Sequence, residues 1–181
     1  MTRKTIWTIG HSTRSLADFV ALLQDEKVMS VADVRRFPAS RRHSHFSKEE
    51  LAEGLRRGGI RYLHLGDLGG RRSGLLAGSP NTGWRVEAFN AYADYMATPA
   101  FEASLAELTV EAEHQQTAIM CAEALPWRCH RRLIADALIV RGWSVIDIIG
   151  AGKVEPHQLT EFARVDGTRL TYPAEPLFTG E

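Results

Sequence analysis

The sequence predicts an α/β protein: a single-domain, mainly parallel five-stranded sheet with helices on both faces. Short strand-like segments alternate with segments whose apolar residues recur at helical spacing, and 181 residues suit one core. Such alternation implies right-handed crossovers between parallel strands. We expect one domain over residues 1–181, with its core over 1–150 and an irregular C-terminal extension over 151–181 that contains three prolines.

The expected elements follow from apolar spacing and from residues typical of helix ends. The strands are expected over residues 6–9, 28–34, 60–65, 118–121 and 145–149. Ser15 and Ser47, each followed three residues later by an acidic residue, are typical of helix starts. Further helices are expected over 86–96, 101–113 and 128–141, and the Gly- and Ser-rich residues 73–83 predict a long loop.

The composition is that of a soluble protein. Apolar residues make up 44% and charged residues 24%, as in ordinary globular domains, and the longest apolar runs are too short to cross a bilayer. The first residues contain no apolar signal region, and two cysteines cannot form a secreted disulfide framework. We therefore expect a cytoplasmic protein without membrane partners.

The residues that follow the expected strands predict the site, because ligands of open parallel sheets bind beyond the carboxyl ends of the strands. Ten of the eighteen arginines fall there, whereas the loops at the opposite edge are acidic or neutral. The net charge of zero gives no global nucleic-acid signature, so the local excess predicts a positive mouth for an anion such as phosphate. The ten are Arg14, Arg35, Arg36, Arg41, Arg42, Arg71, Arg72, Arg128, Arg131 and Arg132.

The segment from Cys121 to Arg131 carries the strongest indication of chemistry. Pro126 is expected to open a helix whose N-terminus faces the loop of Cys121. A thiol in that position, with arginines nearby, has a lowered pKa and suits a nucleophile. Cys121 is therefore the expected nucleophile, and Cys129 is either a resolving thiol or the nucleophile itself.

Other residues at this edge are candidates for proton transfer or binding. Glu123 is expected to act as an acid or base or to hold an arginine, and Asp33 and His11 are candidate proton-handling groups, although His11 could equally cap its turn. Arg35 and Arg131 are candidate anion clamps. The remaining substrate-binding candidates are Ser12, Arg14, Ser40, Gly69, Gly70, Arg71 and His130.

Three alternatives compete with a cysteine nucleophile. A zinc site could use Cys121, Cys129 and a histidine, although the Cys-x-x-Cys pair of zinc deaminases is absent; no other cofactor is expected. The cysteines could also be ordinary core residues. A non-catalytic nucleic-acid-binding module could use the arginine-rich edge with an exposed Trp84 or Trp127 for stacking.

Short segments spread over almost the whole chain form an ordered set. They are residues 8–12, 33–35 with Pro38 and Ser40, Phe46, 68–70, Tyr92, Met96, 121–123, 129–131 and 170–173. Together they resemble the family known as domain of unknown function 488, whose pattern usually has a histidine in the fifth strand where this chain has Asp147. The resemblance supports the fold and the location of the site and implies no settled activity.

The layout around Cys121 is also similar to that of rhodanese-type sulfurtransferases and cysteine phosphatases, which place a thiolate on a strand-to-helix loop. Six residues separate Cys121 from Arg128, one more than in the phosphatase spacing. We therefore predict a cysteine-dependent transferase or hydrolase acting on an anionic, phosphate-bearing substrate such as a nucleotide or nucleic acid.

Overall fold

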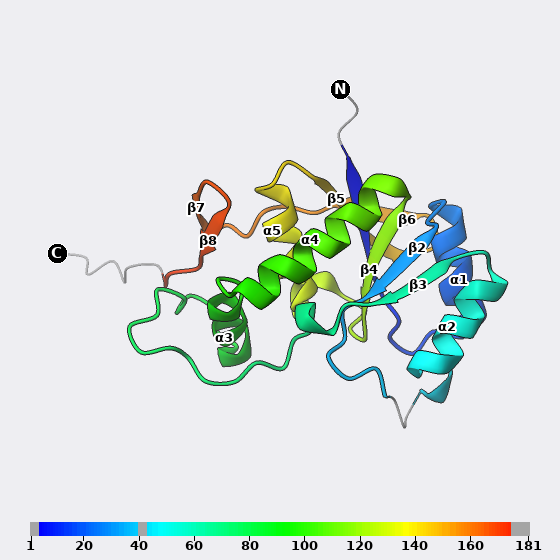
Figure 1. The fold of residues 1–181 in the computed structure, drawn as a ribbon, viewed down its shortest axis with the longest axis horizontal. Coiled ribbons are helices and arrows are strands. Elements are labelled where there is room, and N and C mark those ends of the chain that lie inside the picture. The colour runs from blue at the N-terminus through cyan, green and yellow to red at the C-terminus, as the bar shows by residue number, and fades with distance from the viewer. Residues whose placement is uncertain (1–3, 40–42, 175–181) are drawn as a thin grey trace.

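The computed structural model describes residues 4–39 and 43–174, and its centre is a six-stranded sheet (Figure 1). The strand order is β3-β2-β4-β1-β5-β6. Strands β1 to β5 pair in parallel, and β6 pairs antiparallel with β5. The strands are β1 (Thr5–Gly10), β2 (Ser30–Asp33), β3 (Arg61–His64), β4 (Thr117–Cys121), β5 (Ser144–Gly150) and β6 (Lys153–Pro156).

Five α-helices and three short 3-10 helices lie in the described part of the chain. Ser15 caps the first helix as expected, because its side chain accepts a hydrogen bond from the Asp18 amide at 3.0 Å. Ser47 precedes the second helix without such a bond. The helices are α1 (Leu16–Asp25), α2 (Lys48–Arg57), α3 (Glu87–Tyr95), α4 (Pro99–His114) and α5 (Arg131–Ile139), with η1 (Ser44–Phe46), η2 (Gly66–Leu68) and η3 (Pro126–Arg128).

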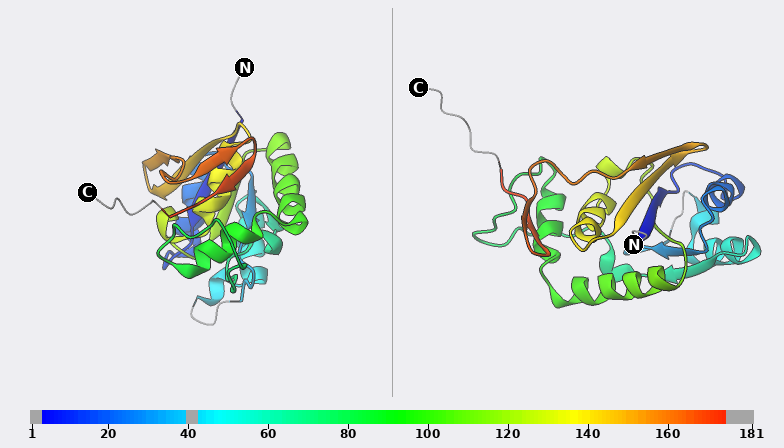
Figure 2. Two further views of the ribbon diagram at one scale, coloured as in Figure 1. Left: turned by 90° about the vertical axis from the view of Figure 1, so that its left-hand side faces the viewer. Right: turned by 90° about the horizontal axis from the view of Figure 1, so that it is seen from above.

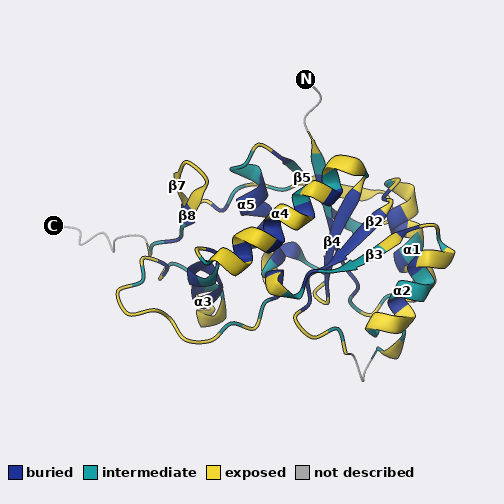
Figure 3. Ribbon diagram, in the orientation of Figure 1, coloured by how far each residue is buried: buried dark blue, intermediate teal, exposed yellow. Residues whose placement is uncertain are grey.

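The helices form two layers because each strand presents alternate side chains to opposite faces of the sheet. On β4, Met120 packs with the core residues of α1 and α2, whereas its neighbour Ile119 packs with those of α4 and α5. The sheet-facing sides of the helices are buried and their outer sides exposed (Figure 3). The predicted α/β fold with a mainly parallel sheet is therefore confirmed.

The prediction of five strands followed by an irregular extension was wrong in part. After β5 the chain turns through Gly152, whose φ of 64° suits glycine, and returns as β6 along the edge of β5. All four residues of β6 are exposed, so the segment has no apolar pattern that would reveal a strand. A second sheet follows, the hairpin of β7 (Arg164–Asp166) and β8 (Arg169–Thr171).

Helix α5 begins later than predicted. Residues 126–128 form the 3-10 turn η3, and α-helical geometry begins only at Arg131. The Cys129 amide bonds the Pro126 carbonyl at 3.1 Å, which closes the short turn before the helix. The N-terminus of α5 therefore faces Cys129, whereas the sequence had predicted that it would face Cys121.

The segment after β6 and helix α3 meet at the end of the molecule opposite α1 and α2 (Figures 1 and 2). Trp84 lies in an aromatic cluster there, with ring centroids 4.9 Å from Phe162 and 5.3 Å from Tyr172. The expected exposure of Trp84 was therefore wrong, whereas Trp127 is exposed. No helix among residues 4–39 and 43–174 has both the length and the apolar character needed to cross a membrane.

Candidate functional site

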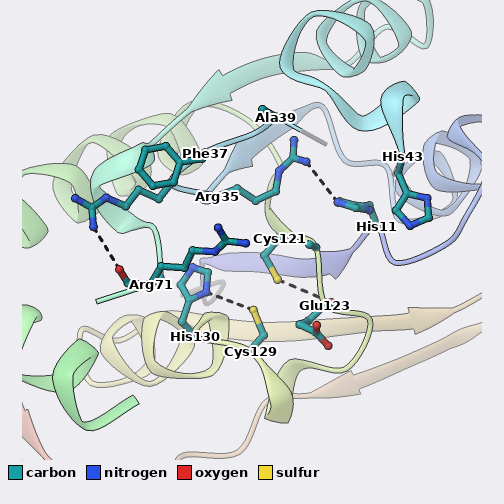
Figure 4. A pocket seen from close by; sticks show the side chains of 13 residues that line it. His11, Arg35, Phe37, Ala39, His43, Arg71, Cys121, Glu123, Cys129 and His130 are labelled. Atoms are coloured by element: carbon teal, nitrogen blue, oxygen red, sulfur yellow. Dashed lines mark hydrogen bonds between the residues drawn. The ribbon is translucent and has the colours of Figure 1, made fainter. Parts of the chain in front are cut away.

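A cavity of about 360 Å³ opens at the carboxyl edge of the sheet (Figure 4). Residues that follow β1, β2, β3 and β4 contribute to its walls, as the crossover topology requires. The lining residues are His11, Arg35, Arg36, Phe37, Ala39, His43, Gly70, Arg71, Cys121, Ala122, Glu123, Cys129 and His130.

Arg35 is fixed in one wall of the cavity by buried partners. Its Nε and Nη2 donate to the two Asp33 carboxylate oxygens at 2.9 and 2.7 Å, and its Nη1 donates to the Phe46 carbonyl at 2.8 Å. The Tyr62 hydroxyl donates to the same Asp33 carboxylate at 2.9 Å. Asp33 is fully buried and does not line the cavity, so this carboxylate positions Arg35 and is not placed to exchange protons with a ligand.

His11 stands beside Arg35 as a neutral imidazole. Its Nδ1 donates to the Ser12 carbonyl at 2.9 Å, which leaves Nε2 as an acceptor 3.4 Å from Arg35 Nη1. Burial, followed by the nearby Arg35 charge, lowers the pKa of His11 to about 4. The ring stacks on Phe46 at 4.3 Å, so His11 presents a fixed, uncharged acceptor to the cavity.

The end of β1 holds the loop that carries Cys121. The His11 and Ser12 amides donate to the carbonyls of Cys121 and Ala122 at 3.0 and 2.9 Å. A Cβ added to Gly10 would lie 1.7 Å from the Glu123 carbonyl oxygen. Because no side chain fits there, the close approach of the two backbones requires glycine at position 10.

Cys121 and Cys129 form a pair of free thiols in the cavity wall. Each thiol affects the ionisation of the other, and the two side chains lie next to each other in Figure 4. Their hydrogen bonds go to other groups: Cys121 Sγ donates to the Glu123 carbonyl at 3.8 Å, and Cys129 Sγ lies 3.5 Å from His130 Nδ1. Burial alone would raise the pKa of Cys121, but the neighbouring Cys129 thiol and the charge of Arg131 lower it below its ordinary value. Burial and the neighbouring Cys121 raise the pKa of Cys129, so Cys121 is the thiol of the pair that loses its proton more readily.

Arg131, the first residue of α5, is a buried cation without a carboxylate partner among the described residues. Its side chain makes one hydrogen bond, from Nη2 to the Ala124 carbonyl at 3.3 Å, and its Nε and Nη1 have no partner in the same part of the chain. Its charge acts on Cys121, Cys129 and His130. A buried charge normally has a counter-ion, and here the Cys121 thiolate is the group that can supply it.

His130 links the thiol pair to the end of β2. Its Nε2 donates to the Val34 carbonyl at 3.1 Å, which leaves Nδ1 as an acceptor 3.5 Å from Cys129 Sγ. Burial first, and then the charges of Arg131 and Arg72, lower the pKa of His130 to about 4. The Arg131 amide also donates to Cys129 Sγ at 3.4 Å. Cys129 therefore has both a proton acceptor and a donor beside its sulfur.

The outer part of the cavity is made by two loops that fit closely together. Arg36 Nη1 donates to the Arg71 carbonyl at 3.3 Å. A Cβ on Gly69 would lie 2.6 Å from the Arg36 backbone nitrogen, so the loops can approach only because this residue is glycine. Phe37 is 64% exposed and lies 5.4 Å from the Arg36 guanidinium. The mouth thus combines arginines with an exposed aromatic ring.

The structure brings together many, but not all, of the residues named from the sequence. His11, Arg35, Gly70, Arg71, Cys121, Glu123, Cys129 and His130 line the cavity, and the Glu123 carboxylate side chain is exposed at its edge. Ser12, Arg14, Asp33, Gly69 and Arg131 do not line it. Arg14 donates to the Gly10 and Ile149 carbonyls, and Ser40 lies outside the described residues.

Sequence reasoning missed Phe37 and the supporting role of Tyr62. Phe37 lies between Arg36 and Pro38, and the signal available in the sequence was an aromatic residue just after an expected strand. Nothing local to Tyr62 indicates its bond to Asp33, because the two residues are 29 positions apart and meet only through β2–β3 pairing. Asp147, which replaces the histidine usual in the resembling family, does not line the cavity; it binds Thr8 and His157.

The zinc hypothesis lacks a set of ligands in residues 4–39 and 43–174. No group of three or more His, Cys, Asp and Glu side chains there is arranged to hold a metal ion. Cys121, Cys129 and His130 are neighbours, but their contacts are the hydrogen bonds described above. The described residues therefore give no support to a resident metal.

Comparison with known proteins identifies the family. The family model described as "Domain of unknown function DUF488" matches residues 15–138, which is more than half of the chain. The chain belongs to the DUF488 family. The resemblance noted from the short segments is thus confirmed, and the DUF488 match includes β2, β3, β4 and the thiol pair. No curated protein and no solved structure matches the chain.

Proposed function

We propose that this DUF488 protein is a cysteine-dependent transferase or hydrolase whose nucleophile is Cys121 and whose substrate is anionic. The observation that carries the proposal is the pair of neighbouring thiols in the cavity wall beside Arg131, a buried cation that no described carboxylate neutralises. A nearby cation stabilises a thiolate at neutral pH, and the thiolate is the nucleophilic form of cysteine.

The surrounding groups support roles in such a reaction. The Cys121 thiolate attacks the electrophilic centre, and the neighbouring Cys129 thiol supplies a proton during group transfer. His130 Nδ1 accepts from Cys129 and can return that proton. Glu123 is exposed at the cavity edge, where a carboxylate can exchange protons with water or a leaving group.

The mouth of the cavity supports a phosphate-bearing substrate such as a nucleotide. Arg36 and Arg71 line the cavity and are exposed, and arginine binds phosphate through paired N–H donors. Phe37 exposes its ring at the same mouth, where a nucleobase could stack. Inorganic phosphate and a mononucleotide are therefore the first ligands to test.

The pH profile of alkylation by iodoacetamide tests the nucleophile. We expect Cys121 to react with an apparent pKa below about 8.5, the value of an unperturbed thiol, and Cys129 to react more slowly. Cys129→Ala removes the thiol that lowers the pKa of Cys121 and should move the Cys121 profile to higher pH. Arg128→Met, a change at an exposed position next to Cys129, should leave the profile almost unchanged. If both thiols react only above pH 8, Cys121 is not an activated nucleophile.

A second candidate function is nucleic-acid binding without catalysis. The exposed Phe37 beside Arg36, together with the exposed Trp127, favours it. This function requires steeply salt-dependent binding of single-stranded nucleic acid that is unaffected by Cys121→Ser. The enzyme proposal instead requires that Cys121→Ser abolish turnover while ligand binding persists.

A further inference from the structure

The two thiols suit a chemistry that differs from attack on a phosphate-bearing substrate. Cys121 ends β4 and Cys129 follows η3, so two separate elements bring the two thiols into the wall of one cavity, where they lie next to each other in Figure 4. A disulfide can form where two such thiols approach each other without a large movement of the backbone.

We infer that Cys121 and Cys129 interconvert between a dithiol and a disulfide by exchange with small anionic disulfides that enter the cavity. This inference rests on the proposed nucleophilicity of Cys121 and adds a second class of substrate to the same site. The anionic preference follows from the exposed Arg36 and Arg71, which line the same cavity as the two thiols.

The exchange balances in two steps. The Cys121 thiolate attacks one sulfur of the small disulfide, which forms a mixed disulfide and releases one thiolate. Cys129 then loses its proton to His130 Nδ1 and attacks the Cys121 sulfur, which forms the Cys121–Cys129 disulfide and releases the second thiolate. Two protein thiols are oxidised, and one small disulfide is reduced to two thiols.

The charge of Arg131 affects the equilibrium between the dithiol and the disulfide. In the reduced form its charge favours the Cys121 thiolate, whereas the disulfide is neutral and removes that anion. Stabilisation of the reduced form makes a disulfide more oxidising, so the Cys121–Cys129 disulfide should be readily reduced. Arg131→Met should shift the equilibrium toward the disulfide, about tenfold for each unit by which the Cys121 pKa rises.

The test uses the full chain, fully reduced, with oxidised glutathione as the anionic disulfide. Acid quenching at timed points, alkylation of free thiols and peptide mapping separate the dithiol, the mixed disulfide and the Cys121–Cys129 disulfide. We expect the wild type to reach the internal disulfide and to be restored by reduced glutathione. Cys129→Ser should stop at a mixed disulfide on Cys121, and Cys121→Ser should form neither species at a comparable rate.

Cystamine, a small cationic disulfide, is the control of opposite charge. Oxidised glutathione should react faster by about tenfold or more, the range over which a charged cleft changes association rates. Equal rates would remove the anionic preference, and a wild type that stops at the mixed disulfide would overturn the inference while leaving the nucleophile intact. Thiols inert to both iodoacetamide and oxidised glutathione would overturn the proposed function as well.

Discussion

Helix α5 carries two buried charged residues that differ in how many hydrogen-bond partners surround them. Arg131, at its first residue, makes one side-chain hydrogen bond and leaves two nitrogen atoms without a partner among the described residues. Asp136, five positions later, accepts from His157 at 3.3 Å, from the Thr160 amide at 3.2 Å and from the Tyr172 hydroxyl at 3.0 Å. Both residues are almost fully buried.

Asp136 belongs to a network of hydrogen bonds that connects the C-terminal segment to α5 and to the sheet. His157 also bonds Asp147 of β5 at 2.9 Å, so its ring lies between two buried carboxylates. Burial alone would lower the pKa of His157, but the bonds to Asp136 and Asp147 raise it to about 9. The positive charge of the His157 imidazolium is therefore balanced by the neighbouring carboxylates, as a structural ion network requires.

The contrast separates a charge that supports the fold from one that supports chemistry. An unsatisfied buried polar group costs about 1–3 kcal/mol, and a charged one costs more. The Asp136 network avoids this cost through protein contacts, whereas two nitrogen atoms of Arg131 have no partner among the described residues, and in our proposal the Cys121 thiolate supplies the missing negative charge. The following predictions test that difference, beginning with the largest effect on stability.

Asp136→Asn should destabilise the protein by about 3–5 kcal/mol, because it leaves part of a buried ion network without its partner. The asparagine amide would also turn a donor toward the donors of Tyr172 or His157. Denaturant unfolding followed by circular dichroism measures the loss. Glu107→Gln, an exposed change of the same chemistry on α4, should stay within about 0.5 kcal/mol.

The free energy of unfolding should fall as the pH rises from about 6.5 to about 9 because of His157. Its pKa is raised in the folded protein, so its contribution is complete below the ordinary histidine pKa of 6.5 and is lost as the pH passes about 9. A shift of this size corresponds to roughly 3 kcal/mol. The difference between wild type and His157→Gln across this range isolates the effect from the titration of Cys121, and a constant difference would contradict it.

Arg131→Met should change the free energy of unfolding by less than about 1 kcal/mol, because a buried charge without a full set of partners can be replaced by an apolar side chain at little cost. The same change should raise the pKa of Cys121, since the charge of Arg131 lowers it. Unfolding curves and alkylation profiles of one preparation provide both values. A stability loss as large as that of Asp136→Asn would make Arg131 a structural residue.

The sequence was sufficient for the fold class and the edge that carries the cavity, because both depend on local patterns. Apolar periodicity located β1 to β5, and the end of each strand named residues such as His11, Arg35 and Cys121. The start of α5 was missed because Pro126 is as compatible with a 3-10 turn as with the first turn of an α-helix.

Features that depend on distant partners could not be predicted. Asp136 meets His157 and Tyr172 across 21 and 36 positions, and no local pattern encodes such a bond. The lack of a carboxylate beside Arg131 is likewise visible only when the neighbours of α5 are known. Sequence patterns therefore indicated which residue types gather at the edge, and the packing decided which of them remain available to a ligand.

Residues 121–124 are held against the end of β1, which limits how the cavity can change shape when a ligand enters. The amides of His11 and Ser12 and the missing side chain of Gly10 hold this loop at three consecutive positions. If the cavity adjusts its shape to the size of a ligand, the movement must therefore come from the opposite rim, where Arg36, Phe37 and Arg71 are exposed. We therefore expect ligand binding to move only one side of the cavity. The loop that carries the Cys121 sulfur stays rigid, and the opposite rim adjusts and selects which ligands reach the thiols.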